Sequence, residues 1–314
     1  MANHLDLTSS QCETQYNLRR AHPDFQHILA DWQVQSAQTR RDLAVAPNLQ
    51  YGPSENETLD LFSAKNKHAP LLLFIHGGYW QSGDKRDVSF VARYLVEAGI
   101  TVCVSNYGLA PGTTLATMVE QTRRTLGWLH ANAARFNFDH RRIYLMGHSA
   151  GAHLAAMMLT RHGLQTASPD PQAAGARNAP NQNPDHPGNH ENGKPAVQGV
   201  IAISGLFDLA PLLQTSINQA LQLKPGEAAR LSPVHLYKEL SSPLYTLVGA
   251  RETEAFKTQE LAIAAHWNQV YPLPHVPDKH HYTVLDIFMD PANPWLREIA
   301  ARITKSKIGF PASR

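Results

Sequence analysis

The chain has 314 residues, of which 43% are hydrophobic, so it can bury a large core in one α/β domain with insertions. Its 28 basic and 26 acidic residues leave a net charge of +2, which gives no electrostatic footprint for nucleic acid or an anionic membrane. Two cysteines argue against a disulfide framework, and no apolar run approaches the ~18 residues that a membrane helix needs.

The first eight residues lack the basic start and apolar run of a secretion signal. We therefore expect a cytoplasmic protein that acts on a small molecule, without nucleic acid or membrane as a partner. The sequence leaves the oligomeric state open, a homodimer included.

An N-terminal helical arm is predicted within residues 1–48. Residues 9–45 have helical periodicity, and Phe25, Leu29 and Trp32 are spaced by four and three residues. The sequence Ala-Pro-Asn at 46–48 is a helix stop signal. We expect this arm to pack on the main domain.

Strands and helices then alternate along the chain, which predicts parallel β-α-β units with right-handed crossovers. The expected strands are residues 58–62, 70–76, 100–105, 142–147, 197–203, 244–248 and 270–275. The expected helices are residues 86–98, 114–133, 150–162, 253–267 and 292–304. Together they predict a mostly parallel central sheet with helices on both faces, in a single domain.

Two segments interrupt this alternation. Residues 165–195 have no apolar face and are dense in chain-breaking residues, which predicts an exposed, mobile insertion. Its histidines match no metal-ligand spacing, so we favour a solvated loop over a metal site. Residues 205–240 are expected to form a small cap-like region above the carboxyl edge of the sheet.

The pentapeptide Gly147-His148-Ser149-Ala150-Gly151 joins a predicted strand to a predicted helix. Glycines at both ends permit a turn too sharp for side chains, and such a turn lifts the serine hydroxyl off the backbone. The serine also lies at a helix N-terminus, where N–H groups favour negative charge. We predict that Ser149 is the nucleophile of an acyl-transfer reaction, in preference to a structural turn.

A second motif, His76-Gly77-Gly78-Tyr79-Trp80, follows an earlier strand. Adjacent glycines allow backbone N–H groups to turn toward a developing oxyanion. We therefore predict an oxyanion hole made by Gly77, Gly78 and Ala150; the alternative is a Gly-Gly turn that merely ends the strand.

The acid and the base of a serine triad should follow Ser149 in that order, each after a later strand. Glu252 and Glu254 both follow the strand at 244–248, and we prefer Glu252 because Glu254 falls in the first turn of a helix. His280 and His281 follow the last strand, and we prefer His281 because an apolar run anchors it. His76 and His148 are expected to support the site, and His153 to be structural.

The motifs at 76–85, 147–156 and 204–209, with the late histidine, resemble the α/β-hydrolase-type kynurenine formamidases, or arylformamidases, and related esterases. The resemblance spans roughly residues 50–290 and implies the α/β-hydrolase fold. It places the nucleophile on Ser149, the oxyanion donors on Gly77, Gly78 and Ala150, the acid on Glu252 and the base on His281. The family's acid is commonly aspartate, so glutamate is a departure.

The resemblance implies hydrolysis of N-formyl-L-kynurenine to kynurenine and formate, without a cofactor and without a metal. Tyr79 and Trp80 could contact the aryl ring, or could only pack their loop; Ser204 is a further candidate for the pocket. Two other functions stay open, a carboxylesterase for short acyl esters and a non-catalytic binding protein with this fold.

Overall fold

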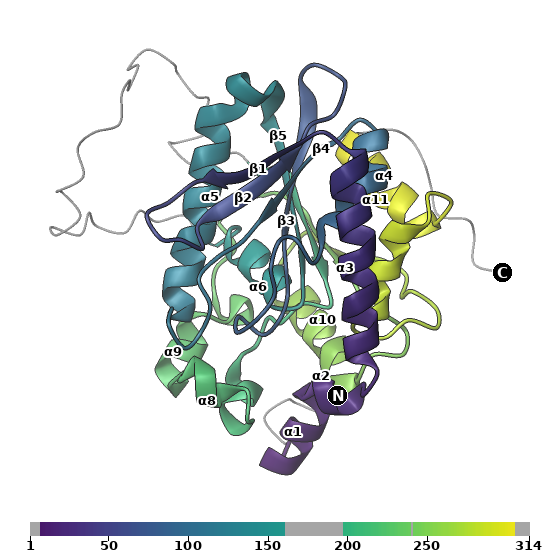
Figure 1. Cartoon of the computed structure of the whole chain (residues 1–314). Coiled ribbons are helices and arrows are strands. Elements are labelled where there is room, and N and C mark those ends of the chain that lie inside the picture. The colour runs from purple at the N-terminus through teal and green to yellow at the C-terminus, as the bar shows by residue number, and fades with distance from the viewer. Residues whose placement is uncertain (1–6, 161–196, 240, 305–314) are drawn as a thin grey trace, which may run out of the picture.

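The computed structural model describes residues 7–160, 197–239 and 241–304, which form an eight-stranded sheet flanked by helices (Figure 1). The strands are β1 Val45–Gln50, β2 Thr58–Phe62, β3 Ala69–Ile75, β4 Thr101–Ser105, β5 Phe138–His148, β6 Gly199–Ile203, β7 Leu244–Leu247 and β8 Val270–Pro272. Their order in the sheet is β1-β2-β4-β3-β5-β6-β7-β8. The pairs β1–β2 and β2–β4 are antiparallel and the other five pairs are parallel, so the predicted mostly parallel sheet is confirmed.

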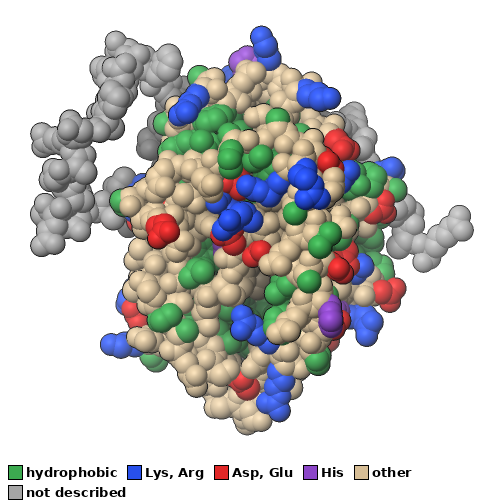
Figure 2. All heavy atoms as spheres, viewed as in Figure 1, with side chains coloured by type: hydrophobic (Ala, Val, Ile, Leu, Met, Phe, Trp, Pro, Cys, Tyr) green, Lys and Arg blue, Asp and Glu red, His purple; other side chains and the backbone are tan. Residues whose placement is uncertain are grey.

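Helices cover both faces of this sheet. The α-helices are α1 Ser9–Tyr16, α2 Leu18–Ala21, α3 Phe25–Asp42, α4 Arg93–Glu97, α5 Leu115–Phe136, α6 Ala150–Met157, α8 Asn218–Leu221, α9 Pro225–Arg230, α10 Glu254–His266 and α11 Pro294–Thr304. The 3-10 helices are η2 Ser89–Ala92, η5 Ala210–Gln214, η6 Pro233–His235 and η7 Thr283–Met289. Within the described ranges, no helix is long and apolar enough to span a membrane. Acidic and basic side chains are interspersed on the face seen in Figure 2.

The central strand β3 is apolar on both sides because each side faces its own core. Leu71, Leu73 and Ile75 belong to the core that includes side chains of α5, α6 and α10. Leu72 and Phe74 belong to the core that includes side chains of α3, α4 and α11. Such two-sided burial is typical of parallel strands covered by helices.

The predicted N-terminal helical arm is divided into separate helices. It forms three helices, because the Asn17 side chain accepts a hydrogen bond from Arg20 N and starts α2, and Pro23 disfavours helical geometry at His22. The chain after it forms strand β1, which the sequence analysis took only as a stop signal. Pro47 is compatible with β1 because this strand lies at the sheet edge.

One predicted helix is interrupted in the structure. The helix expected at 86–98 is divided into the short 3-10 helix η2 and α4. The expected cap-like region at 205–240 contains the short helices η5, α8, α9 and η6. The insertion expected at 165–195 lies outside the described residues.

The turn between β5 and α6 should tolerate no side chain at Gly151. An ideal Cβ there would lie 2.0 Å from the carbonyl oxygen of Ile75 in β3. We expect Gly151→Ala to lower the free energy of unfolding by about 1–3 kcal/mol or more through overpacking. Urea denaturation measures this change.

Gly127→Ala is the matched control. A Cβ at Gly127, on the exposed side of α5, would meet no atom within 4 Å. This substitution should raise the stability by ~0.5–1 kcal/mol, because alanine is the better helix former. Equal stability of Gly151→Ala and the wild type would contradict the rigid contact between the turn and β3.

Candidate active site

Ser149 lies in the sharp turn between the end of β5 and the start of α6. Its backbone has φ 56° and ψ −118°, a strained conformation for a residue with a side chain. An ideal Cβ on Gly147 would lie 2.2 Å from the carbonyl carbon of Gly151, so the turn closes only with glycines. Ser149 N donates to Ile203 O at 2.8 Å, which ties the turn to β6.

Glu252 and His281 come together in the interior near this turn. Glu252 lies in the loop after β7 and His281 lies just before η7, and both side chains are almost fully buried. His281 Nδ1 donates to Glu252 Oε2 at 2.9 Å, and Ser204 Oγ donates to Glu252 Oε1. Both carboxylate oxygens are thus satisfied. With the proton on Nδ1, the Nε2 of His281 carries the lone pair.

The rival candidates lie elsewhere. Glu254 begins α10 with 79% of its side chain exposed, and it pairs with Lys257 at 2.8 Å. The ring of His280 stacks on that of His22 with 4.0 Å between the ring centres, and it is His281 that holds Glu252. The geometry thus brings together the pair that the sequence analysis preferred.

The side chain of His148 forms a hydrogen bond with the main chain of His281. Its Nε2 donates to the carbonyl oxygen of His281 at 2.8 Å. Burial lowers the pKa of His148 well below its ordinary value, so this ring is neutral at neutral pH. His76 Nδ1 donates to Gly77 O at 2.8 Å, and His153 Nε2 donates to Leu231 O at 2.7 Å.

The segment after β3 presents its backbone to Ser149. A Cβ added to Gly77 would lie 3.1 Å from the Cβ of Ser149, which shows how closely the two segments approach. Gly78 has φ +104°, a conformation that favours glycine. Among the described residues, none accepts a hydrogen bond from the N–H of Gly78 or of Ala150. These N–H groups are free to bind an anionic oxygen.

Ser149 and His281 both line one cavity of about 350 Å³. No hydrogen bond joins Ser149 Oγ to a described residue. Much of the wall is apolar or aromatic and consists of Phe25, Leu29, Trp32, Phe74, Val88, Tyr282 and Leu285. The arm also contributes Asn17, Leu18 and Arg19, and the segment after η5 contributes Ser216 and Ile217.

The contribution of the arm to this cavity does not follow from the sequence. The periodicity of Phe25, Leu29 and Trp32 predicts only packing on the main domain. The periodicity is ambiguous because an apolar helix face can pack against a core or line a cavity.

The three candidate substrate contacts have different positions. Tyr79 lines the cavity, and its hydroxyl donates to Tyr16 O in the arm at 2.6 Å. Trp80 is fully buried and absent from the cavity wall, because its ring packs edge-on against His153 in the core at 5.1 Å. Ser204 is also absent from the wall, because its hydroxyl is directed to Glu252. Neither Trp80 nor Ser204 lines this cavity, so their contact with a substrate stays a prediction.

Comparison with known proteins gives a family model, BD-FAE, that matches residues 59–252. Kynurenine formamidase of Salmo salar is 28% identical over 254 residues, which are 77% of this chain and 76% of the relative. Esterase LipQ of Mycobacterium tuberculosis is 28% identical over 72% of this chain and 53% of the relative. A solved structure from Silicibacter, assigned as a thioesterase, has a TM-score of 0.70 at 28% identity, over 85% of this chain and 90% of the other.

The family model covers more than half of the chain, and these relatives are hydrolases. The chain is thus an enzyme with the α/β-hydrolase fold, and both an arylformamidase-like and a carboxylesterase activity fit its relatives. The fold and the matched segment together show that the chain belongs to the BD-FAE family.

Proposed function

We propose that Ser149 is the nucleophile, His281 the general base and Glu252 the acid of a serine triad. The observation that carries this proposal is the strained Ser149 turn on the same cavity as a histidine whose Nδ1 is bound to a buried carboxylate. His281 Nε2 takes the proton of Ser149 Oγ as the oxygen attacks the acyl carbon. Glu252 holds the ring in this tautomer and stabilises the imidazolium that forms.

The N–H groups of Gly77, Gly78 and Ala150 then hold the oxyanion of the tetrahedral intermediate. His281 returns its proton to the leaving group as the acyl–serine ester forms. Water, deprotonated by His281, hydrolyses this ester and releases the acid. His148 is a positioning residue in this scheme, because its hydrogen bond fixes the backbone that carries His281.

The substrate that we propose is N-formyl-L-kynurenine, which gives kynurenine and formate. A formyl group is the smallest acyl group, so the leaving aryl amine must supply most of the contacts. The aromatic wall of Phe25, Trp32 and Tyr282 suits its ring. Arg19, also on the wall, donates to Ser82 Oγ at 3.2 Å and forms no ion pair with a described acidic side chain, so its charge suits the carboxylate of the substrate. The name of the Salmo salar relative supports the same substrate.

A carboxylesterase for short acyl esters is the second candidate. It needs the same three side chains and the same oxyanion donors, and it differs in the acyl group and in the leaving group that the pocket must fit. Its support is the relative named esterase LipQ.

Glu252→Gln should lower kcat by roughly 10²- to 10⁴-fold, because the amide no longer stabilises the imidazolium. Glu254→Gln is the matched control, since Glu254 is exposed and pairs with Lys257. It should keep wild-type activity. Steady-state kinetics on one ester and one formyl amide measure both variants. Loss of activity in the second variant alone would move the acid to Glu254.

Ser149→Ala should reduce turnover of every substrate by at least ~10³-fold. The wild type should hydrolyse N-formyl-L-kynurenine with a higher kcat/KM than p-nitrophenyl acetate. Absorbance assays on the two substrates measure this ratio. A strong preference for the ester would refute the formamidase and favour the carboxylesterase. Unchanged turnover by Ser149→Ala would refute the triad itself.

Arg19→Ala should lower kcat/KM for N-formyl-L-kynurenine by roughly 5- to 30-fold, because a charge-assisted contact at a partly exposed site is lost. Formanilide has the same scissile bond and no carboxylate, so its hydrolysis should stay unchanged. Arg20→Ala is the control, since Arg20 is the neighbouring arginine and lies off the cavity wall. Equal effects on both formyl amides would exclude Arg19 as the carboxylate contact.

A further inference from the structure

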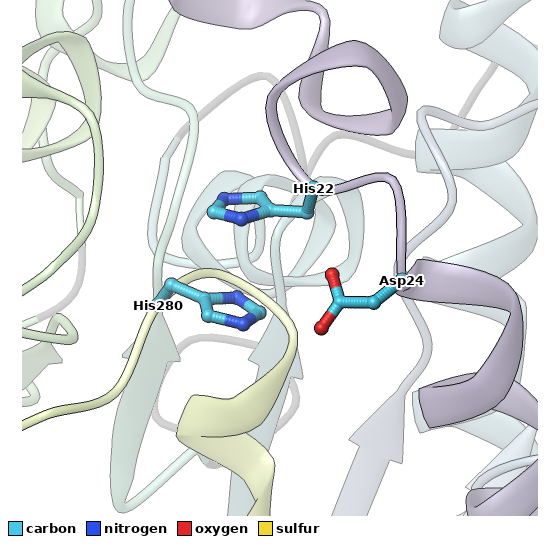
Figure 3. A group of neighbouring side chains, drawn as sticks. All are labelled: His22, Asp24 and His280. Atoms are coloured by element: carbon cyan, nitrogen blue, oxygen red, sulfur yellow. The ribbon is translucent and has the colours of Figure 1, made fainter.

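Three metal-ligating side chains lie together beside the cavity, outside its wall. His22, Asp24 and His280 each offer one ligand atom, and these atoms all lie within 4.8 Å of one another (Figure 3). His22 and Asp24 come from the turn between α2 and α3, and His280 comes from the loop before η7. Segments far apart in the sequence thus meet at this cluster.

His22 and Asp24 each have a lone pair that no described residue uses. His22 Nε2 is buried and has no hydrogen-bond partner. Asp24 occupies the N-cap position of α3, yet its carboxylate makes no capping hydrogen bond. His280 Nδ1 accepts a long hydrogen bond from Tyr282 N at 3.3 Å, so its Nε2 carries the proton, and coordination through Nε2 requires the other neutral tautomer and the loss of this bond. Hydrogen bonding within the fold therefore does not explain why these groups lie together.

We propose that His22, Asp24 and His280 bind a divalent transition-metal ion of the zinc type. Two imidazoles and one carboxylate suit Zn²⁺, whereas Mg²⁺ and Ca²⁺ prefer an all-oxygen shell. Ligand atoms at ~2.0 Å from a tetrahedral ion lie about 3.3 Å apart, so the cluster must contract slightly. The exposed Asp24 side chain can move to do so, and water fills the fourth position.

The imidazoles need release no proton to bind the ion. Burial lowers the pKa of His22 to about 4, and it also lowers the pKa of His280. Both rings are therefore neutral at neutral pH, as metal coordination requires. The alternative role of the cluster is structural, since the stacked rings also pack the arm against the His280 loop.

A bound ion would tie the arm to the segment that carries His281. His280 directly precedes His281, so coordination should restrain the proposed base and inhibit hydrolysis. This inhibitory effect rests on the proposed function, whereas the binding site does not.

Calorimetric titration of the full chain with Zn²⁺, after treatment with a chelator, tests the site. His22→Ala and Asp24→Asn should each weaken Zn²⁺ binding by at least ~10-fold. His27→Ala is the matched control, because His27 is an exposed histidine on the first turn of α3 outside the cluster. It should bind Zn²⁺ as the wild type does. The visible spectrum of bound Co²⁺ should be lost in the same two variants.

Wild-type Zn²⁺ binding by both His22→Ala and Asp24→Asn would overturn the site and assign the metal to other histidines. No binding by the wild type would overturn it as well. Asp24→Asn gives the answer even if His22→Ala fails to fold, because Asp24 is exposed.

Ester hydrolysis in the presence of Zn²⁺ tests the inhibitory effect separately. Zn²⁺ should inhibit the wild type and His27→Ala, and it should leave Asp24→Asn active. Equal inhibition of all three proteins would overturn the coupling to His281. A chain without any hydrolase activity would refute the proposed function, and calorimetry would still decide the metal site.

Discussion

The contact between the Ser149 turn and the end of β3 is the constraint on which the candidate site depends. A Cβ on Gly151 would lie 2.0 Å from Ile75 O, and one on Gly77 would lie 2.9 Å from His148 O. Backbones therefore touch directly where β3, β5 and α6 meet. Because the proposed oxyanion donors belong to these same backbones, the approach that fixes the Ser149 turn also places the donors beside it.

Glu252 connects residues that follow neighbouring strands of the sheet. A buried carboxylate costs several kcal/mol of desolvation unless its oxygens are hydrogen-bonded. Here Ser204 at the end of β6 and His281 beyond β8 each satisfy one oxygen. The need to satisfy a buried charge thus fixes the ring of His281. It also leaves one imidazole nitrogen for the proton transfer that we propose.

The parts of the fold that local pattern determines could be predicted from the sequence. The central strands are continuous apolar runs, and the Ser149 turn has a distinctive glycine spacing. The choice between His280 and His281 was harder, because adjacent residues in a loop differ only in which side chain faces inward. The support of Glu252 by Ser204 could not be predicted, since it joins residues 48 positions apart. Strand β1 could not be predicted because it contains Pro47, and proline is compatible with a strand only at the edge of a sheet.

The distribution of the site along the chain bears on substrate choice. The segment matched by the family model, 59–252, contains Ser149, the glycines of the proposed oxyanion hole and Glu252. The wall formed by Arg19, Phe25 and Trp32 lies outside that segment. The relatives include proteins named as a formamidase and as an esterase, so amide and ester hydrolysis both occur among these names. A change in the arm can alter the fit of the leaving group without disturbing the acyl-transfer machinery. We therefore expect the arm, more than the segment 59–252, to determine which acyl compound this enzyme hydrolyses.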